Sequence, residues 1–278
     1  MCRKLIRLTM LILCIFFVGA DLFAQQKNIP NVAYQDHNVR LTLITKGVIR
    51  MEWDPDGKFV DNASFLSANR QYQPVSYEIK NSKRTIEIRT SKMIVKYVKN
   101  SGKFTAANLS IMSVKGLLPF KWIPGTVDKG NLKGTYRTLD GYNGGFNNNK
   151  PMPIEDGLLS TDGWTFIDDS KNYLFDNSDW PWVTERQNKN GQDFYFMAYG
   201  HNYKSALKDF TAFSGKVPLP PRYAFGYWWS RYWSYSDNEL RNLIDNFHTY
   251  NIPLDVLVVD MDWHYTEPGK GGWTGYTW

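Results

Sequence analysis

Side chains that could bind a polar ligand gather near the end of the sequence. Asp260 and Asp262 are followed by Trp263 and His264, and all four come after an apolar run at 254–259. Continuous runs rich in β-branched residues are typical of strands buried on both faces of a parallel sheet. Such strands place ligand sites at their carboxyl ends. The pattern predicts a binding site at a strand end, with a turn carrying two solvated acids as the alternative.

The residues before this run have the pattern of a strand and a helix. An aromatic strand is expected at 224–229, and Ser236 and Glu239 have the spacing of a helix capping box. The helix that follows has an apolar face formed by Leu240, Leu243, Ile244 and Phe247. Strand, helix and parallel strand make one right-handed crossover unit. One unit cannot bury its own sheet, so the pattern predicts the start of a larger α/β domain.

The preceding part of the chain predicts an antiparallel β-sandwich. A hairpin is expected over 37–53, and further short strands are expected at 77–79, 85–88, 93–97, 164–167 and 194–199. Residues 203–210 have apolar positions at helical spacing, and Gly215 is placed to end that helix. The proline-rich segment 217–221 predicts a stiff linker, and therefore a domain boundary.

A long segment rich in glycine and proline, 119–163, interrupts the strands. Loops of this length inside a compact domain are often functional. Asp140 and Asp162 each precede a glycine in this segment. Their alternative role is to stabilise tight turns, for which Asp-Gly pairs are favoured.

The N-terminus has the pattern of a secretory signal. Basic residues lie at 3, 4 and 7, an apolar run follows at 8–19, and Ala20 and Ala24 offer cleavage points. The run is short for a membrane span, although a signal anchor is the alternative. A lipid anchor at Cys14 is not favoured, because the bulky Leu13 precedes it. The expected organisation is a signal peptide at 1–24, a sandwich at 25–215 and the start of a barrel at 216–278, in an exported protein.

Composition and charge exclude several classes of protein. The formal charge is +6, and removal of the signal leaves +4 spread among 26 acidic residues, so nucleic-acid binding has little support. Both cysteines lie within the signal, and the four histidines have no ligand-like spacing, so no metal or other cofactor is expected. Aromatic residues make up 16% of the chain. Aromatic rings stack on sugars, but a β-rich core also consumes them.

Two motifs together carry a resemblance to a known family. The segment Pro-Arg-Tyr-Ala-Phe-Gly-Tyr-Trp-Trp-Ser-Arg-Tyr at 221–232, followed by Ile-Pro-Leu-Asp at 252–255 and Asp-Met-Asp-Trp at 260–263, resembles glycoside hydrolase family 31. The loop motifs at 131–141 and 157–170 also look like the N-terminal domain of that family. The resemblance implies a retaining enzyme acting on α-linked glucosides or xylosides, with an N-terminal antiparallel β-sandwich followed by a (β/α)8 TIM barrel, of which the first two strands are present.

The resemblance also implies roles for particular residues. Asp260 matches an acid that hydrogen-bonds the sugar in the −1 subsite, and Tyr232 matches an aromatic residue that lines it. Asp140 is a candidate near the +1 subsite, and Trp229 and Trp263 are candidates for the pocket wall. The expected ligand is an oligosaccharide or glycoside.

The residues that cleave the bond are expected elsewhere. The two catalytic aspartates of the family come after the fourth barrel strand, so they are expected beyond the C-terminal end of these 278 residues, which alone should be inactive. Asp260 and Asp262 lie two apart on one segment and are rejected as a catalytic pair. The alternative function is a non-catalytic carbohydrate-binding β-sandwich module.

Overall fold

The chain folds into two compact units, Met1–Lys216 and Val217–Trp278. The structure, a computed structural model, describes residues 31–135, 154–260 and 263. The expected signal peptide at 1–24 lies outside the described residues.

The first sheet of the larger unit has five antiparallel strands in the order β1-β2-β3-β12-β9. Their bounds are Val32–Gln35 (β1), Val39–Thr45 (β2), Val48–Trp53 (β3), Gln192–Ala198 (β12) and Trp164–Asp168 (β9). The hairpin expected at 37–53 is formed by β2 and β3, which pair Leu41 with Met51. Both side chains are fully buried. The alternating apolar residues of this hairpin therefore face the core.

The second sheet also has five antiparallel strands, in the order β4-β5-β6-β7-β8. Their bounds are Glu78–Asn81 (β4), Thr85–Arg89 (β5), Met93–Val98 (β6), Leu109–Ser113 (β7) and Lys121–Trp122 (β8). A separate small hairpin pairs Leu174–Phe175 (β10) with Val183–Thr184 (β11). In the second sheet, β4, β5 and β6 were expected from the sequence at 77–79, 85–88 and 93–97, whereas β7 and β8 were not.

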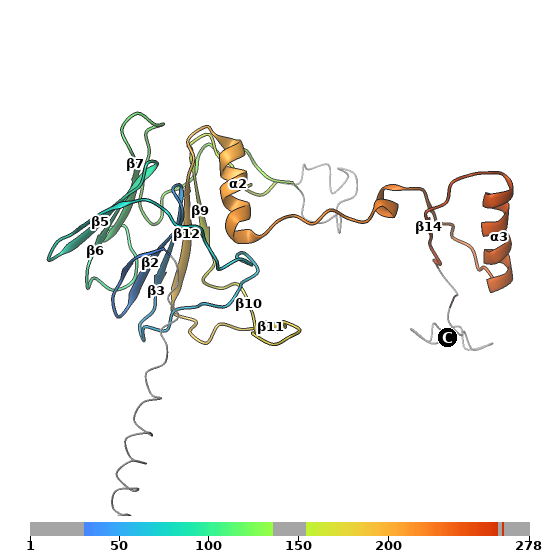
Figure 1. The fold of residues 1–278 in the computed structure, drawn as a ribbon, viewed down its shortest axis with the longest axis horizontal. Coiled ribbons are helices and arrows are strands. Elements are labelled where there is room, and N and C mark those ends of the chain that lie inside the picture. Colours follow the sequence, from blue (N-terminus) through green and yellow to red (C-terminus); the bar gives the residue numbers. More distant parts are fainter. Residues whose placement is uncertain (1–30, 136–153, 261–262, 264–278) are drawn as a thin grey trace, which may run out of the picture. The chain divides into compact units, whose positions relative to one another are not determined.

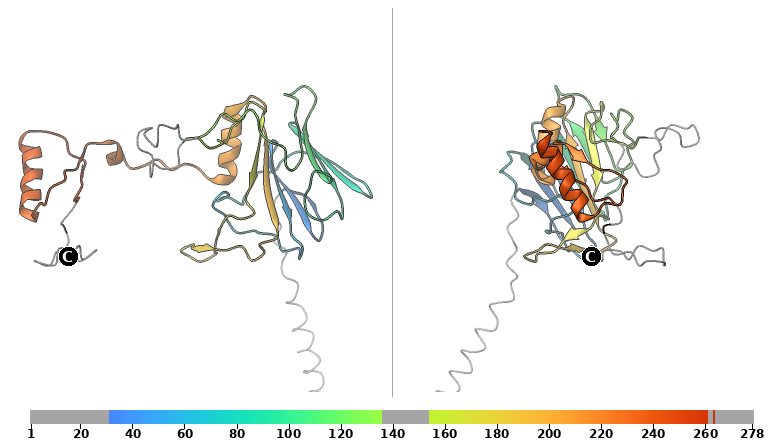
Figure 2. Two further views of the ribbon diagram at one scale, coloured as in Figure 1. Left: turned by 180° about the vertical axis from the view of Figure 1, so that it is seen from behind. Right: turned by 90° about the vertical axis from the view of Figure 1, so that its right-hand side faces the viewer.

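The two sheets face each other, as Figures 1 and 2 show, and the main cluster of buried apolar side chains draws its members from both of them. Ile86, Ile88 and Val95 of the second sheet belong to the same buried cluster as Leu41 and Phe196 of the first. Two antiparallel sheets that share an apolar core form a sandwich. The predicted fold of the N-terminal part is therefore confirmed.

A helix covers the opposite face of the first sheet (Figure 1). This helix, α2, spans Tyr203–Ser214, and the Asn202 side chain accepts a hydrogen bond from the amide of Ser205 at its start. Ala206 and Phe213 are buried against the sheet, whereas Leu207, which the sequence pattern placed on the apolar face, is 48% exposed. The helix faces the sheet mainly through its aromatic residues, and Leu207 lies beside that contact.

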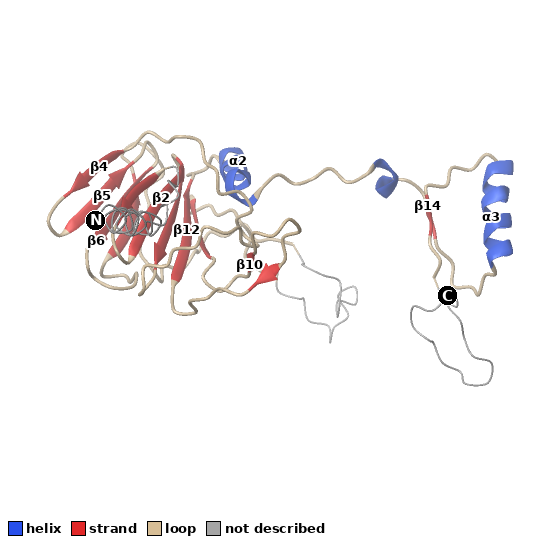
Figure 3. Cartoon of the chain, turned by 60° about the horizontal axis from the view of Figure 1, so that its bottom comes forward, coloured by secondary structure: helices blue, strands red, loops and turns tan. Residues whose placement is uncertain are grey.

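The smaller unit has the expected order of strand, helix and parallel strand. Strands β13 (Trp228–Trp229) and β14 (Val256–Leu257) pair in parallel, and helix α3 (Asp237–Thr249) connects them. Figure 3 shows α3 in blue. Ser236 and Glu239 form the predicted capping box, with each side chain bonded to the backbone of the other residue. The unit is therefore built as a crossover, in agreement with the sequence.

Two details of this unit differ from the sequence-based expectation. Residues 222–225 form a short 3-10 helix, η1, instead of the first part of a strand. The apolar run at 254–259 is not buried on both faces, since Val256 and Leu257 are half-buried and Val259 is 46% exposed. Helix α3 covers one face of this two-stranded sheet through Phe247, and the described part of the unit contains no other element that covers the second face.

Candidate functional site

The parallel pairing of β13 and β14 brings the segments after both strands to one edge. Trp229 pairs with Leu257, and the amide of Val258 donates to the carbonyl of Trp229 over 2.9 Å. Tyr232 and Asp260 each lie three residues beyond this pair, and both are exposed. The two residues expected to bind a sugar therefore follow paired positions at the carboxyl edge of the sheet.

The start of the two strands is held together by Asp255. Its carboxylate accepts the amide proton of Tyr227 over 2.8 Å, and its own amide donates to the carbonyl of Tyr227 over 3.0 Å. Gly226 makes room for that carboxylate, because a Cβ at this position would lie 2.1 Å from Cγ of Asp255. The register that leaves Tyr232 and Asp260 each three residues beyond the same pair thus depends on Gly226 and Asp255, two motif residues to which the sequence alone assigned no role.

The tryptophans near this edge have different surroundings. The ring of Trp229 packs edge-on against Phe247 of α3, with ring centroids 5.4 Å apart, so it lies on the helix side of the sheet. Trp228, the neighbouring residue of the strand, is 50% exposed, and Trp263 is half-buried. A sugar contact for Trp229 or Trp263 stays a prediction. Asp140, Asp262 and His264 lie outside the described residues.

The chemistry at this edge suits binding of a hydroxylated ligand. An ionised carboxylate has two acceptor oxygens and can take hydrogen bonds from two neighbouring hydroxyl groups at once. An exposed tyrosine ring offers an apolar face and a polar tip. Of the described residues that directly follow β13 and β14, Asp260 is the one with a carboxylate. The described edge can therefore bind such a ligand, but it does not contain the pair of carboxyl groups that retaining cleavage requires.

A second constellation lies in the sandwich unit, where the two loop motifs meet. Asn131 and Ser160 form an isolated antiparallel bridge, and the amide of Gly134 donates to the carbonyl of Glu155 over 2.9 Å. The Asn131 side chain holds this pairing from both sides, because it accepts from the amide of Gly157 over 2.8 Å and donates to its carbonyl over 3.0 Å. These segments, residues 128–134 and 155–160, form a stem that pairs the described residues on either side of the segment 136–153.

The stem is fixed to the sheet through its acidic and aromatic neighbours. Asp128 accepts from the Asn131 side chain over 2.8 Å and from the Ser160 hydroxyl over 2.5 Å. The amide of Ser160 donates to the hydroxyl of Tyr199 over 2.7 Å, and burial raises the pKa of that phenol. Asp162 accepts from the amide of Lys129 over 3.1 Å, and because Lys129 lies 33 residues away this bond connects the two loop motifs and does not stabilise a local turn.

In the sequence, the two halves of this stem belong to separate motifs, 131–141 and 157–170. The signal that could have joined them is the Asp-x-x-Asn spacing of Asp128 and Asn131, two residue types that stabilise turns through their side chains. The spacing alone does not predict which distant backbone groups the Asn131 side chain will hydrogen-bond. The pairing with Gly157 is therefore visible only in the structure.

Comparison with known proteins adds to this geometry. The sequence profile of the TIM-barrel domain of glycosyl hydrolases family 31 matches residues 217–278. An α-xylosidase of Saccharolobus solfataricus is 34% identical over 123 residues, which make up 41% of this chain and 16% of that enzyme. Alpha-glucosidase 2 of Bacillus thermoamyloliquefaciens is 40% identical over 73 residues, 26% of this chain and 9% of the enzyme. The GH31 dextranase of Flavobacterium johnsoniae, solved with isomaltotriose, has a TM-score of 0.47 at 20% identity, covering 84% of this chain and 34% of that one.

The match covers only a small part of each curated relative, at most about a sixth of its length. The barrel profile covers the whole of the smaller unit, which contains β13, α3 and β14. Residues 217–278 therefore match the TIM-barrel domain of glycosyl hydrolases family 31, in agreement with the resemblance that the motifs at 221–232, 252–255 and 260–263 carry.

Proposed function

We propose that this chain forms the N-terminal part of an exported retaining α-glycoside hydrolase that acts on α-linked glucosides or xylosides. The observation that carries the proposal is the placement of Tyr232 and Asp260 three residues beyond a paired position of β13 and β14. The substrate class is supported by the names of the relatives, an α-xylosidase and an α-glucosidase.

In this proposal, Asp260 binds two neighbouring hydroxyl groups of the sugar in the −1 subsite, and Tyr232 lines the same subsite. A hydrogen bond to a charged group is worth about 1.5–3 kcal/mol. If both bonds are made fully only as the sugar reaches its transition state, they lower the barrier instead of simply holding the substrate. Asp260 would then orient the ring and would take no part in bond cleavage.

Cleavage with retention needs two carboxyl groups about 5–5.5 Å apart across the glycosidic bond. One of them attacks the anomeric carbon, and the other protonates the leaving oxygen and later activates water. We propose that neither role belongs to residues 1–278. The chain as given is therefore expected to release no phenol from an aryl α-glucoside or α-xyloside, and turnover that survives Asp260→Ala would contradict these assignments.

The test of the sugar-binding role uses the protein expressed from the whole reading frame that contains residues 1–278. We expect hydrolysis of an aryl α-glucoside or α-xyloside, and we expect Asp260→Ala to lower kcat/KM by roughly 1,000-fold, the equivalent of two charge-assisted bonds of about 2 kcal/mol each. The matched control is Asp245→Ala, which removes an exposed carboxylate from α3. An unchanged rate in Asp260→Ala would remove Asp260 from the substrate pocket.

Export is proposed on the basic residues and apolar run at the N-terminus, which lie outside the described residues. The described helices include none that is long and apolar enough to cross a membrane. We expect the processed protein in the periplasm or the medium to begin after Ala20 or Ala24, as determined by mass spectrometry of its N-terminal peptide. A chain that keeps Met1 and stays in the cell would contradict this proposal.

A further inference from the structure

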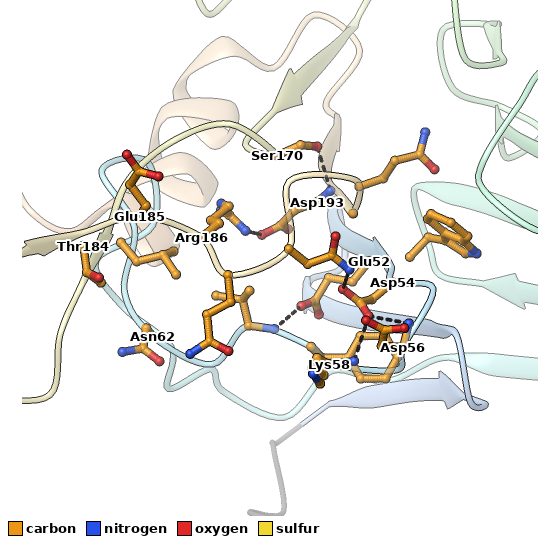
Figure 4. A pocket seen from close by; sticks show the side chains of 18 residues that line it. Glu52, Asp54, Asp56, Lys58, Asn62, Ser170, Thr184, Glu185, Arg186 and Asp193 are labelled. Atoms are coloured by element: carbon orange, nitrogen blue, oxygen red, sulfur yellow. Dashed lines mark hydrogen bonds and ion pairs between the residues drawn. The ribbon is translucent and has the colours of Figure 1, made fainter.

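The sandwich unit contains a pocket that the proposed glycosidase function does not use. It has a volume of about 400 Å³ and lies where three segments meet, 52–62, 170–174 and 184–193 (Figure 4). The first segment follows β3, the second follows β9, and the third connects β11 to β12. Pockets of this size with several converging polar groups are the usual form of small-molecule sites in proteins.

The floor of the pocket is a network of buried ion pairs. Both oxygens of Asp193 accept from the Arg50 guanidinium, over 2.8 and 2.7 Å, and Arg186 adds a third bond over 3.0 Å. Arg186 also donates to Asp169 over 2.8 Å, and Arg50 lies 3.1 Å from Glu52. All five side chains are at least nine-tenths buried.

The buried charges of this floor stay ionised because each lies beside a group of opposite charge. Burial disfavours the ionised form of Asp193, yet Arg50 and Arg186 keep the pKa of its carboxyl well below the ordinary value. Removal of any one member would leave a buried charge without its partner, which costs several kcal/mol. The floor is therefore rigid, and a ligand that enters the pocket meets polar groups that are already oriented.

The rim, in contrast, offers polar groups that are not used inside the protein. The described structure shows no hydrogen bond from the side chains of Asp56, Thr184 or Gln187, all of which line the pocket and are exposed. Asn62 uses its amide nitrogen on the carbonyl of Phe175 over 2.9 Å, which leaves its side-chain oxygen open. Carboxylate, hydroxyl and amide groups together can both accept from and donate to a ligand.

The charge of the lining selects among classes of ligand. Five carboxylates line the pocket, but Glu52 and Asp193 are paired with Arg40 and Arg50, and Glu185 is paired with Lys189. Asp54 and Asp56 are the lining carboxylates for which the described structure shows no ion pair, against the one such cation, Lys58. This remaining negative charge disfavours an anion. The described residues include no group of three or more His, Cys, Asp or Glu side chains suited to a metal ion.

Apolar surface also lines the pocket, from Trp53, Phe59 and Leu174. The faces of aromatic rings accept the C–H side of a sugar, while the hydroxyl groups of the sugar need the mixture of donors and acceptors found at the rim. A neutral polyhydroxylated molecule satisfies both requirements, and neither an anion nor a bare metal ion does.

We propose that this pocket of the sandwich is a binding site for a neutral sugar, of the size of a mono- or disaccharide. Asp56 and Asn62 accept from its hydroxyl groups, Thr184 and Gln187 exchange further bonds with it, and the apolar wall contacts its carbon face. The site belongs to residues 52–193 alone. It would persist if the role of Asp260 were disproved.

The experiment measures binding to the 278-residue chain by calorimetry, with methyl α-glucoside, xylose and maltose as probes, and with inorganic phosphate and calcium as probes of the other classes. We expect saturable binding of at least one sugar. Asp56→Asn replaces the charge and one acceptor oxygen with a donor, and Thr184→Val removes a hydroxyl group, so each should raise the Kd by about tenfold.

Matched variants separate this site from others. Asp179→Asn changes an exposed carboxylate outside the pocket. Asp260→Ala removes the carboxylate that is proposed to bind a sugar in the −1 subsite. Asp179→Asn should leave the Kd unchanged, Asp260→Ala should leave in place the binding that Asp56→Asn weakens, and an unliganded Tm equal to that of the parent shows that each variant is folded. The proposal is overturned if no sugar binds, if phosphate or calcium binds more tightly than every sugar, or if Asp260→Ala abolishes binding that Asp56→Asn leaves intact.

Discussion

Asp193 shows how a single side chain can decide the stability of the sandwich. It lies on β12, is almost completely buried, and accepts hydrogen bonds from two arginines that come from other parts of the chain. The sequence does not reveal this role, because Arg40, Arg50 and Glu52 alternate with apolar residues on their strands and have the pattern of a solvated face. The structure buries that face, and the opposite charges compensate one another across the strands.

Replacement of this carboxylate should be costly. We expect Asp193→Asn to lower the free energy of unfolding by about 3 kcal/mol, because Arg50 and Arg186 stay buried with one negative charge less. Urea unfolding at neutral pH measures the change. The exposed Asp179→Asn should shift the free energy by less than about 0.5 kcal/mol, and an equally small effect at Asp193 would show that the network contributes little.

The same residue predicts a dependence on pH. Because Arg50 and Arg186 hold the pKa of Asp193 below its ordinary value, its contribution to stability is complete above pH about 4 and is lost as the pH falls through the lowered pKa. Asp169 acts in the opposite direction, since burial and the charge of Asp193 raise its pKa. The difference in unfolding free energy between the parent and Asp193→Asn should therefore shrink in acid, and a constant difference down to pH 2 would contradict this account.

At the scale of elements, the sequence predicts correctly those helices and strands whose structure depends on residues close together in the chain. The capping box at Ser236 and the helix after it follow from spacing alone. The segment 222–229 does not, because its aromatic residues suit a strand while Pro221 and Gly226 favour a turn, and the structure forms η1 before a two-residue strand. The stem at Asn131 was also missed, because its partner lies 26 residues away.

The capping box can be tested in the helix that it starts. We expect Ser236→Ala to weaken the first turn of α3 by about 1 kcal/mol, since the amide of Glu239 loses its acceptor. Amide hydrogen exchange in α3 should become roughly fivefold faster, with no change in α2. Asn242→Ala, on the exposed face of α3, should have the opposite effect because alanine favours helix, so faster exchange in both variants would count against the cap.

The stem can be tested through Asn131. We expect Asn131→Asp to open it, because the new carboxylate cannot donate to the Gly157 carbonyl and repels Asp128. The amides of Leu132 and Gly134, which donate across the stem, should exchange about tenfold faster, the equivalent of one lost hydrogen bond. Asn190→Asp, an exposed change in another loop, serves as the control, and unchanged protection at Leu132 would show that the stem does not need Asn131.

At the scale of the whole molecule, the high aromatic content finds its explanation largely in the sandwich core. Phe196 is fully buried, and its ring centroid lies 5.1 Å from that of Trp122 and 5.9 Å from that of Trp164. From the sequence alone, the aromatic residues could either stack on sugars or fill a β-rich core. For these three the core is the answer, whereas Tyr232 is exposed and available to a ligand.

The buried aromatic rings predict how the sandwich responds when one of them is replaced by alanine. We expect Phe196→Ala to lower the free energy of unfolding by about 3–5 kcal/mol, because it leaves a cavity among rings that contact one another closely. Phe225→Ala removes the same atoms from a ring that is 78% exposed and should cost less than about 1 kcal/mol. Equal losses in urea unfolding would contradict the description of the core.

The stem has a practical consequence for protein engineering. Its two sides, 128–134 and 155–160, already bring the ends of the intervening segment together. Once the ends are joined, doubling the length of a flexible insert costs only about 0.6 kcal/mol. Segments of other sequence and length can therefore be grafted between residues 134 and 155 while the sandwich beneath keeps its stability.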